Sequence, residues 1–323
     1  MRALVVEAAD APFRLVELER PRLSARQVLV RIKASGVNPL DTKIRRGAAG
    51  HARHRLPAVL GLDLAGIVEE IGDGVSSFQA GDEVYGMTGG VGGLQGSLAE
   101  FAAVDVDLLA IKPVNLSMTE AAALPLVFIT AWEGLIDRAA MHAGQRVLVQ
   151  GAGGVGRMVI QLARARGGEV WAVDSAPKHD SIAALGAIPI DRSRPVEAYV
   201  AEHTGGAGFD LVYDTVGGAA LDASFHAVRR FGHVVSCLGW GTHALAPLSF
   251  RAATYSGVFT LLPLLTGEGR AHHGEILQQA TTLVEAGLVI PRLDPRRFTF
   301  DTIEEAHASV ERRDAGGKVV VEI

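Results

Sequence analysis

Apolar and polar residues alternate in short runs over about the first 120 residues of the chain. Segments such as MRALVVEA (1–8), QVLVRIKASG (27–36) and DLAGIVEEIG (63–72) have the length of strands and are separated by glycine-containing turns. This alternation is typical of half-buried strands joined by hairpins and tight turns. The pattern therefore predicts a β-rich domain over residues 1–121.

The pattern changes between residues 122 and 260, where short apolar runs alternate with segments of helical length. Runs of this kind are typical of the buried strands of a parallel sheet. The five runs are RVLVQ (146–150), EVWAVD (169–174), AIPID (187–191), FDLVYD (209–214) and HVVSC (233–237). The fold class is therefore predicted to be α/β, with a doubly wound parallel sheet over residues 122–260. Residues 261–323 are predicted to belong to the same domain as residues 1–121.

Composition narrows the possible functions. The 323 residues include 48% apolar and 21% charged residues, with a formal net charge of −5, which predicts two folded domains and argues against a nucleic-acid partner. The single cysteine, Cys237, allows no intramolecular disulfide and no zinc site built from several thiolates. The longest apolar runs are shorter than the roughly 20 residues of a membrane helix. We therefore expect a cytoplasmic protein with no membrane partner.

A glycine-rich turn follows the first predicted strand of the parallel sheet. Gly151, Gly153 and Gly156 match the pattern G-x-G-x-x-G between a strand and a helix. The first glycine permits the tight turn, the second lets a pyrophosphate approach the backbone, and the third allows close packing of helix on strand. The free N–H groups at the helix N-terminus favour the phosphates. The predicted dinucleotide-binding residues are Gly151, Gly153, Gly154, Val155 and Gly156.

An acid ends the second strand of the same unit. Asp174 lies 18 residues after Gly156, near the distance at which an acid meets the ribose hydroxyls of NAD. A carboxylate there repels the 2′-phosphate of NADP. Lys178 and Arg192 are close enough in sequence to neutralise Asp174 or to hold that phosphate. The sequence therefore favours NAD(H) over NADP(H) and leaves NADP(H) open.

Five motifs, in order along nearly the whole chain, resemble the medium-chain dehydrogenase/reductase superfamily, and in particular its zinc-free quinone oxidoreductase branch. They are GVNPLDTKIRRG (36–47), VLGLDLAGIVEEIGDGVSSFQAGDEVYG (59–86), EAAALPLVFITAWEGL (120–135), GAGGVGRMVIQLARARG (151–167) and GKVVVEI (317–323). The resemblance implies a GroES-like domain (1–121 and 261–323), a Rossmann domain (122–260) and an acceptor in the cleft between them. It also implies a homodimer or homotetramer.

The resemblance bears on metal binding. Zinc-dependent members carry a cysteine where this chain has Asn38, and Gly-His-Glu where it reads Gly61-Leu62-Asp63. Their third ligand comes from the segment near Leu126, which has no thiolate or imidazole. A catalytic zinc site needs three such protein ligands. We therefore expect no zinc.

Without a metal, the reaction that needs least assistance is hydride transfer to a quinone or an α,β-unsaturated carbonyl, whose developing oxyanion requires hydrogen-bond donors and then a proton. Asn38 is a candidate donor, or else its side chain is bonded within the turn before Pro39. Asp41 is a second candidate, on a short helix predicted over residues 39–46. Thr130 resembles the threonine beside the nicotinamide ring, or else is bonded back to a carbonyl one turn earlier.

Ligands of open parallel sheets lie beyond the carboxyl ends of the strands. This places Val216, Cys237 and Gly239 near the cofactor. Cys237 has no cationic neighbour in sequence, and we expect a buried, unreactive thiol. The segment GMTGGVGGLQGS (86–97) is rich enough in glycine to suggest a mobile lid.

Two other functions are compatible with the same residues. One is an alcohol dehydrogenase-type enzyme acting on alcohols or aldehydes. The other is a catalytically silent nucleotide-binding protein that serves as a sensor or structural component.

Overall fold

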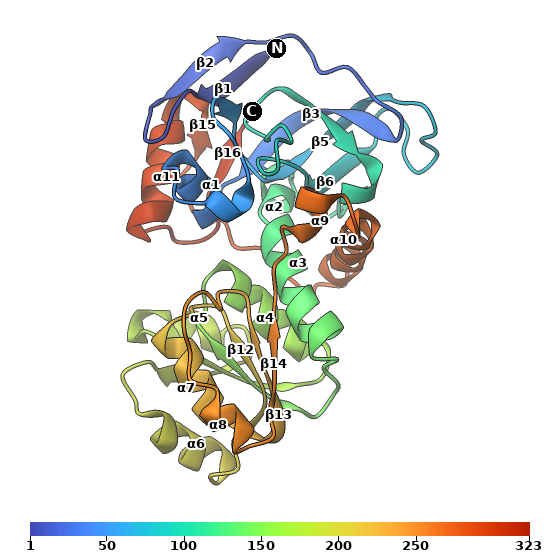
Figure 1. The fold of residues 1–323 in the computed structure, drawn as a ribbon. Coiled ribbons are helices and arrows are strands. Elements are labelled where there is room, and N and C mark those ends of the chain that lie inside the picture. Colours follow the sequence, from blue (N-terminus) through green and yellow to red (C-terminus); the bar gives the residue numbers. More distant parts are fainter. The chain divides into compact units, whose positions relative to one another are not determined.

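The computed structural model describes residues 1–323 and divides into two compact units. Unit 1 contains residues 1–126 and 261–323, and unit 2 contains residues 127–260. The first division falls after Leu126 and not after residue 121, within helix α3 (Pro125–Trp132). The sequence does not indicate this position because α2 (Met118–Ala122) and α3 follow one another closely, with only residues 123 and 124 between them (Figure 1).

Unit 1 is built on a seven-stranded sheet in the order β15-β16-β3-β5-β6-β8, with β7 also paired to β3. Its strands are β3 (Gln27–Gly36), β5 (Asp63–Ile71), β6 (Glu83–Met87), β7 (Phe101–Asp105), β8 (Leu109–Ile111), β15 (Phe298–Thr299) and β16 (Val320–Glu322). A three-stranded sheet contains β1 (Arg2–Val6), β2 (Phe13–Glu17) and β4 (Ala58–Val59). The C-terminal strand β16 pairs antiparallel with β3, which places residues from opposite ends of the chain side by side.

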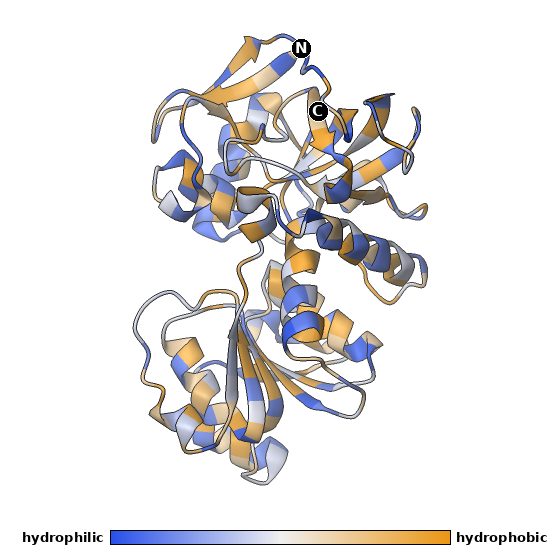
Figure 2. Ribbon diagram, turned by 45° about the vertical axis from the view of Figure 1, so that its right-hand side comes forward, coloured by the Kyte–Doolittle hydropathy of each residue, from blue (hydrophilic) through white to orange (hydrophobic).

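The helices of unit 1 cover its larger sheet (Figure 1). Besides α2, they are α1 (Pro39–Arg45), α9 (Leu262–Thr266), α10 (Arg270–Glu285) and α11 (Ile303–Arg312). The α10 helix buries Ile276, Leu277 and Ala280 and turns polar residues outward, an amphipathic pattern that is visible in Figure 2. The hydroxyl of Tyr85 on β6 donates to the carbonyl of Leu277 at 2.7 Å and ties this helix to the sheet.

Unit 2 contains a six-stranded parallel sheet in the order β11-β10-β9-β12-β13-β14, which confirms the predicted doubly wound class. The strands are β9 (Arg146–Gln150), β10 (Glu169–Asp174), β11 (Ile188–Asp191), β12 (Phe209–Asp214), β13 (Val228–Ser236) and β14 (Thr254–Gly257). The edge strand β14 was not predicted, because TYSG is short and lacks an apolar run. Strand order reverses between β9 and β12, where ligands of such sheets bind.

Helices flank this sheet and bury its apolar strands (Figure 2). They are α4 (Gly154–Ala165), α5 (His179–Ala183), α6 (Val196–Thr204), α7 (Ala219–Ala227) and α8 (Ala246–Ser249). A π-helical segment, Glu133–Arg138, continues α3. No helix anywhere in the molecule combines the length and the apolar character needed to cross a lipid bilayer.

The glycine-rich segment 86–97 is held to the rest of unit 1 by buried side chains and backbone hydrogen bonds, which argues against its interpretation as a mobile lid. Met87 and Val91 are fully buried, and the loop N–H groups of Gly96 and Ser97 bond to Val59 and Gly61 of unit 1. A Cβ on Gly96 would lie 2.2 Å from the carbonyl oxygen of Leu60. Glycine serves here for close backbone approach rather than for flexibility.

Candidate functional site

The glycine turn of unit 2 connects β9 to α4. Gly151 has a φ of +86°, which favours glycine, and a Cβ on Gly156 would lie 1.8 Å from the carbonyl oxygen of Gly151. A Cβ on Gly153, by contrast, would have no atom within 4 Å. Gly153 is the N-cap of α4, so the free N–H groups of the first helical turn begin beside this open space. The turn thus fits a pyrophosphate group.

Asp174 lies at the end of β10 and is bonded to the glycine turn. Its Oδ2 accepts the N–H of Ala152 at 2.7 Å, and its Oδ1 accepts the N–H of Ser175 at 2.8 Å. Burial acts to raise the pKa of Asp174, but these N–H groups and the Lys178 ammonium outweigh it and hold the pKa below its usual value. The carboxylate is therefore ionised, and it is positioned beside the turn.

The two basic residues expected near Asp174 differ in position. Lys178 places its Nζ 3.1 Å from Asp174 Oδ2. Arg192 donates its backbone N–H to the Asp174 carbonyl at 3.0 Å, and its side chain is exposed. The structure thus brings Asp174, Lys178 and Arg192 together at the end of β10.

The loops after β12 and β13 are held by a residue that sequence reasoning missed. The fully buried carboxylate of Asp214 accepts the N–H groups of Val216 and Gly217 at 3.0–3.1 Å and the hydroxyl of Ser236 at 2.7 Å. Ser236 Oγ in turn accepts the N–H of Leu238 at 3.0 Å. One buried carboxylate therefore fixes both loops that were predicted to meet the cofactor. Asp214 ends an apolar strand, as Asp174 does, and this position could have identified it as a site residue from the sequence.

The other predicted residues of these loops differ in exposure. Val216 is 53% exposed. Burial raises the pKa of the Cys237 thiol to about 12, and the nearby Asp214 adds to this effect. A Cβ on Gly239 would lie 2.1 Å from the Tyr255 hydroxyl, so the backbone approaches β14 closely at this point. Cys237 is half-buried and not buried as expected from the sequence, and its lack of reactivity stays a prediction.

Thr130 on α3 is buried, and its hydroxyl lies 3.1 Å from that of Thr260. The Thr260 hydroxyl donates to Glu133 Oε2 at 2.6 Å. The backbone carbonyl of Thr130 accepts the hydroxyl of Tyr213 at 2.6 Å. Thr130 is therefore held by several polar contacts within unit 2, and its position beside a nicotinamide ring stays a prediction.

Asn38 and Asp63 form a buried polar cluster in unit 1. Asn38 Nδ2 donates to Asp63 Oδ2 at 2.9 Å, and the N–H of Leu126 donates to Asp63 Oδ1 at 2.9 Å. The Lys318 ammonium donates to Asn38 Oδ1 and lies 3.3 Å from Asp63 Oδ2. Asn38 and Asp63 are fully buried. Burial raises the pKa of Asp63, and Lys318 and the other donors oppose the rise.

The two interpretations of Asn38 have different outcomes. Its side chain forms a capping box with Asp41 at the start of α1, which agrees with bonding within its own turn, and its amide is also bonded to Asp63 and Lys318. The side chain is fully buried, and its role as a donor to an acceptor stays a prediction. Lys318 was not singled out from the sequence, because it lies 280 residues from Asn38. The one available signal was a lysine directly before the apolar C-terminal strand.

Asp41, the second candidate, lies on α1 beside this cluster. Its Oδ2 accepts the backbone N–H of Asn38 at 2.8 Å, while its Oδ1 is buried without a hydrogen-bond partner. Burial raises the pKa of Asp41 to about 7, and the neighbouring Asp63 adds to the rise, whereas the Asn38 N–H and Lys318 oppose it. The structure therefore brings Asn38 and Asp41 together.

The positions that hold zinc in zinc-dependent relatives do not fit a zinc ion in this chain. They contain the Asn38 amide, the Leu62 side chain and the apolar segment at Leu126, and the carboxylate of Asp63 is bonded to Asn38 and Lys318. No three His, Cys, Asp or Glu side chains in the molecule lie close enough together to hold a metal ion.

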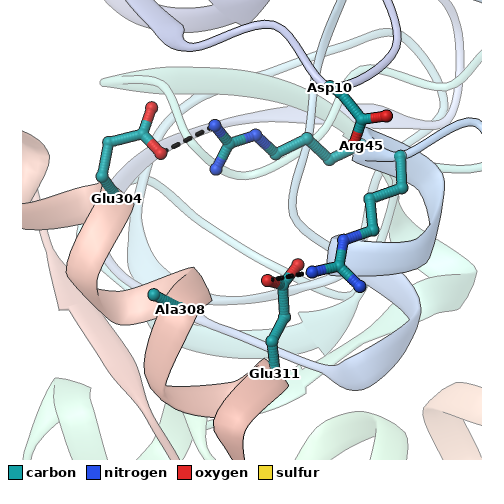
Figure 3. A pocket seen from close by; sticks show the side chains of 6 residues that line it. Asp10, Arg45, Glu304, Ala308 and Glu311 are labelled. Atoms are coloured by element: carbon teal, nitrogen blue, oxygen red, sulfur yellow. Dashed lines mark hydrogen bonds and ion pairs between the residues drawn. The ribbon is translucent and has the colours of Figure 1, made fainter.

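A second polar feature of unit 1 is a cavity of about 220 Å³ between α1 and α11. Arg45 pairs with Glu304 at 2.7 Å and Arg46 pairs with Glu311 at 2.5 Å across it (Figure 3). Asp10 adds a further negative charge to the lining. Because each arginine has its own carboxylate, the cavity has no excess positive charge with which to bind an anion.

The sequence matches two family models and several characterised proteins. Residues 24–114 match the alcohol dehydrogenase GroES-like domain, and residues 185–321 match a domain described as zinc-binding dehydrogenase. The chain is 37% identical over 310 residues to 2-methylene-furan-3-one reductase of Solanum lycopersicum, covering 93% of this chain and 73% of that protein. It belongs to the medium-chain dehydrogenase/reductase superfamily.

Other members of the superfamily are similar to this chain in sequence or in structure. The chain is 35% identical to the chloroplastic NADPH-dependent alkenal/one oxidoreductase of Arabidopsis thaliana, again over 93% of this chain and 73% of the relative. The crystal structure of an alcohol dehydrogenase superfamily protein from Novosphingobium aromaticivorans is 58% identical and superposes with a TM-score of 0.99, covering 100% and 99% of the two chains. The resemblance inferred from the five motifs is confirmed.

Proposed function

We propose that this protein transfers a hydride from a reduced nicotinamide cofactor to an α,β-unsaturated carbonyl compound or a quinone, without zinc. The observation that carries the proposal is the glycine turn, in which Gly153 faces open space beside the N-terminus of α4. The names of the Solanum and Arabidopsis relatives, a furanone reductase and an alkenal/one oxidoreductase, support the choice of acceptor.

The chain's own residues would have separate roles in the reaction. Gly151, Gly153, Gly154, Val155 and Gly156 would hold the pyrophosphate, and the loops fixed by Asp214 would hold the nicotinamide end. When bound, the cofactor supplies the hydride. A polar cluster would stabilise negative charge on the acceptor and supply its proton. This cluster consists of Asn38, Asp63 and Lys318, with Asp41 beside it.

The test is oxidation of NADH and NADPH against a panel of enones and quinones, followed by absorbance of the reduced nicotinamide, with the product identified by NMR. The proposal expects a saturated carbonyl compound or a hydroquinone. Oxidation of simple alcohols together with stoichiometric zinc would instead support the alcohol dehydrogenase alternative. Cofactor binding without turnover of any acceptor would support the silent nucleotide-binding alternative.

We further propose that NADH is preferred over NADPH. Asp174 is ionised and lies beside the glycine turn, where it would accept a ribose hydroxyl and repel a 2′-phosphate. The name of the Arabidopsis relative, which is NADPH-dependent, makes a direct test worthwhile.

Replacing Asp174 with serine should raise the NADPH-to-NADH ratio of kcat/KM by about tenfold or more, because the repulsive charge is lost while Lys178 stays. Asp191→Ser is the matched control, since Asp191 pairs in register with Asp174 at the end of β11 and is bonded to Ser193. The control should leave the ratio unchanged. An equal ratio in wild type and Asp174→Ser would refute the ribose assignment.

The oligomeric state is proposed to be a homodimer or homotetramer. The short edge strand β14 leaves one side of the parallel sheet unpaired, and its Tyr255 is 38% exposed. Light scattering of the purified protein at micromolar concentration would contradict this if it gave the mass of one chain.

A further inference from the structure

Lys318 lies where four segments of unit 1 meet. Its ammonium donates to Asn38 and to Asp63, and Asp63 also accepts the N–H of Leu126. The segments of Asn38, Asp63 and Leu126 are those that, by the resemblance, supply the metal ligands in zinc-dependent members of the superfamily. In this chain the Lys318 ammonium contacts two of these segments, through Asn38 and Asp63.

The backbone of Lys318 is held by hydrogen bonds on both sides. The N–H of Lys318 donates to the Arg292 carbonyl at 2.7 Å, and the N–H of Asp294 donates to the Lys318 carbonyl at 3.0 Å. The Asp63 carboxylate then holds the far end of the side chain. A cation held at both ends needs little reorganisation when charge develops beside it.

Lys318 also differs from the rest of the cluster in exposure. Asn38 and Asp63 are fully buried, whereas the Lys318 side chain is 11% exposed. An ammonium has three N–H donors, and the contacts with Asn38 and Asp63 use two of them. The third N–H is left to donate to a bound molecule.

We propose that Lys318 is a catalytic residue whose ammonium takes the electrostatic place of a metal ion and donates to the carbonyl oxygen of the acceptor. This inference rests on the proposed function. Asp63 and Asn38 act as positioning residues, because they hold the ammonium without contacting the acceptor themselves.

The proposed step balances for an enone. Hydride adds to the β-carbon, the electron pair of the C=C bond moves to form a new C=C bond at the carbonyl carbon, and the carbonyl π pair becomes a lone pair on oxygen. Lys318 stabilises this oxyanion and transfers a proton to it, which leaves an enol and a neutral amine. The amine regains a proton from solvent, and the enol tautomerises to the saturated carbonyl compound.

The first test removes both charges of the pair together, because Lys318→Met alone leaves a buried carboxylate without its cation. The variant D63N/K318M should fold and bind NADH as the wild type does, measured by thermal unfolding and by calorimetry. Its kcat/KM for the enone should fall about 100- to 1000-fold. Asp63→Asn alone keeps the ammonium and should lose much less.

The second test restores the ammonium chemically. Lys318→Cys is made together with Asp63→Asn, so that no buried carboxylate is left without its cation. Treated with 2-bromoethylamine, this cysteine carries an S-aminoethyl side chain that is nearly isosteric with lysine, and the reference for full restoration is Asp63→Asn alone. The native Cys237 is half-buried and the pKa of its thiol is raised to about 12, so we expect it to react much more slowly than the introduced cysteine. Treated wild type is the control, and mass spectrometry should find one added group in the variant and none in the control.

Alkylation should raise the kcat/KM of D63N/K318C by at least about tenfold. The role of Lys318 is overturned if D63N/K318M turns over the enone within about threefold of wild type. It is also overturned if alkylation of a folded, cofactor-binding D63N/K318C restores nothing. A wild type that reduces no enone would refute the proposed function itself and this inference with it.

Discussion

Replacing Gly156 with alanine is expected to abolish productive binding of the dinucleotide and to destabilise unit 2. The added Cβ would lie 1.8 Å from the carbonyl oxygen of Gly151, a backbone atom that cannot move without reshaping the turn. Overpacking of this kind costs about 1–3 kcal/mol. The affinity for NADH should fall roughly 10- to 100-fold, since the N–H groups of the turn would no longer converge on the phosphates.

The measurement can be made specific to unit 2, because all three tryptophans (Trp132, Trp171 and Trp240) lie within residues 127–260. Urea unfolding followed by tryptophan fluorescence should show a lower midpoint for Gly156→Ala. Calorimetry with NADH should show the loss of affinity.

Gly153→Ala separates the phosphate role from the folding role. Gly153 has a φ of −77°, which alanine adopts, and its Cβ would enter open space. Stability should change by less than about 1 kcal/mol, while NADH binding should weaken because the methyl group would occupy the space assigned to the pyrophosphate. Unchanged NADH affinity in Gly153→Ala would contradict the assignment of the turn.

The parts of the site that could be predicted from the sequence are those made by residues close together in the chain. The turn from Gly151 to Gly156 is local, and its strand and helix are both visible in the hydrophobic pattern. Asp174 follows from a fixed spacing within the same βαβ unit. Such features need no knowledge of how distant segments pack.

The parts that could not be predicted depend on contacts between distant segments. Lys318 reaches Asn38 because β16 pairs with β3, a pairing that no local pattern encodes. The glycines of residues 86–97 also have two physical uses, flexibility and close backbone approach, and the sequence does not distinguish them. Only the neighbouring carbonyl of Leu60 shows that the second use applies.

Asp214→Ala is the second substitution with a large expected effect, because one carboxylate serves two loops. Its removal leaves the N–H groups of Val216 and Gly217 and the hydroxyl of Ser236 without their acceptor. The Ser236 hydroxyl is buried, and leaving such a group unpaired costs about 1–3 kcal/mol, whereas the N–H groups of Val216 and Gly217 are nearer to solvent and add less. We therefore expect a loss of about 1–3 kcal/mol, visible as a lower urea midpoint. The KM for NADH should rise as both loops loosen.

Asp210→Ala distinguishes the loop role from a general effect on β12. Asp210 lies near the opposite end of the same strand, where its carboxylate accepts Arg229 Nε at 2.5 Å and the N–H of Arg146 at 2.7 Å. Its loss should destabilise unit 2 but leave the KM for NADH of the folded fraction unchanged, because no cofactor loop depends on it. If Asp210→Ala and Asp214→Ala raised the KM equally, the loops would owe their order to the stability of the strand as a whole, and not to the Asp214 carboxylate.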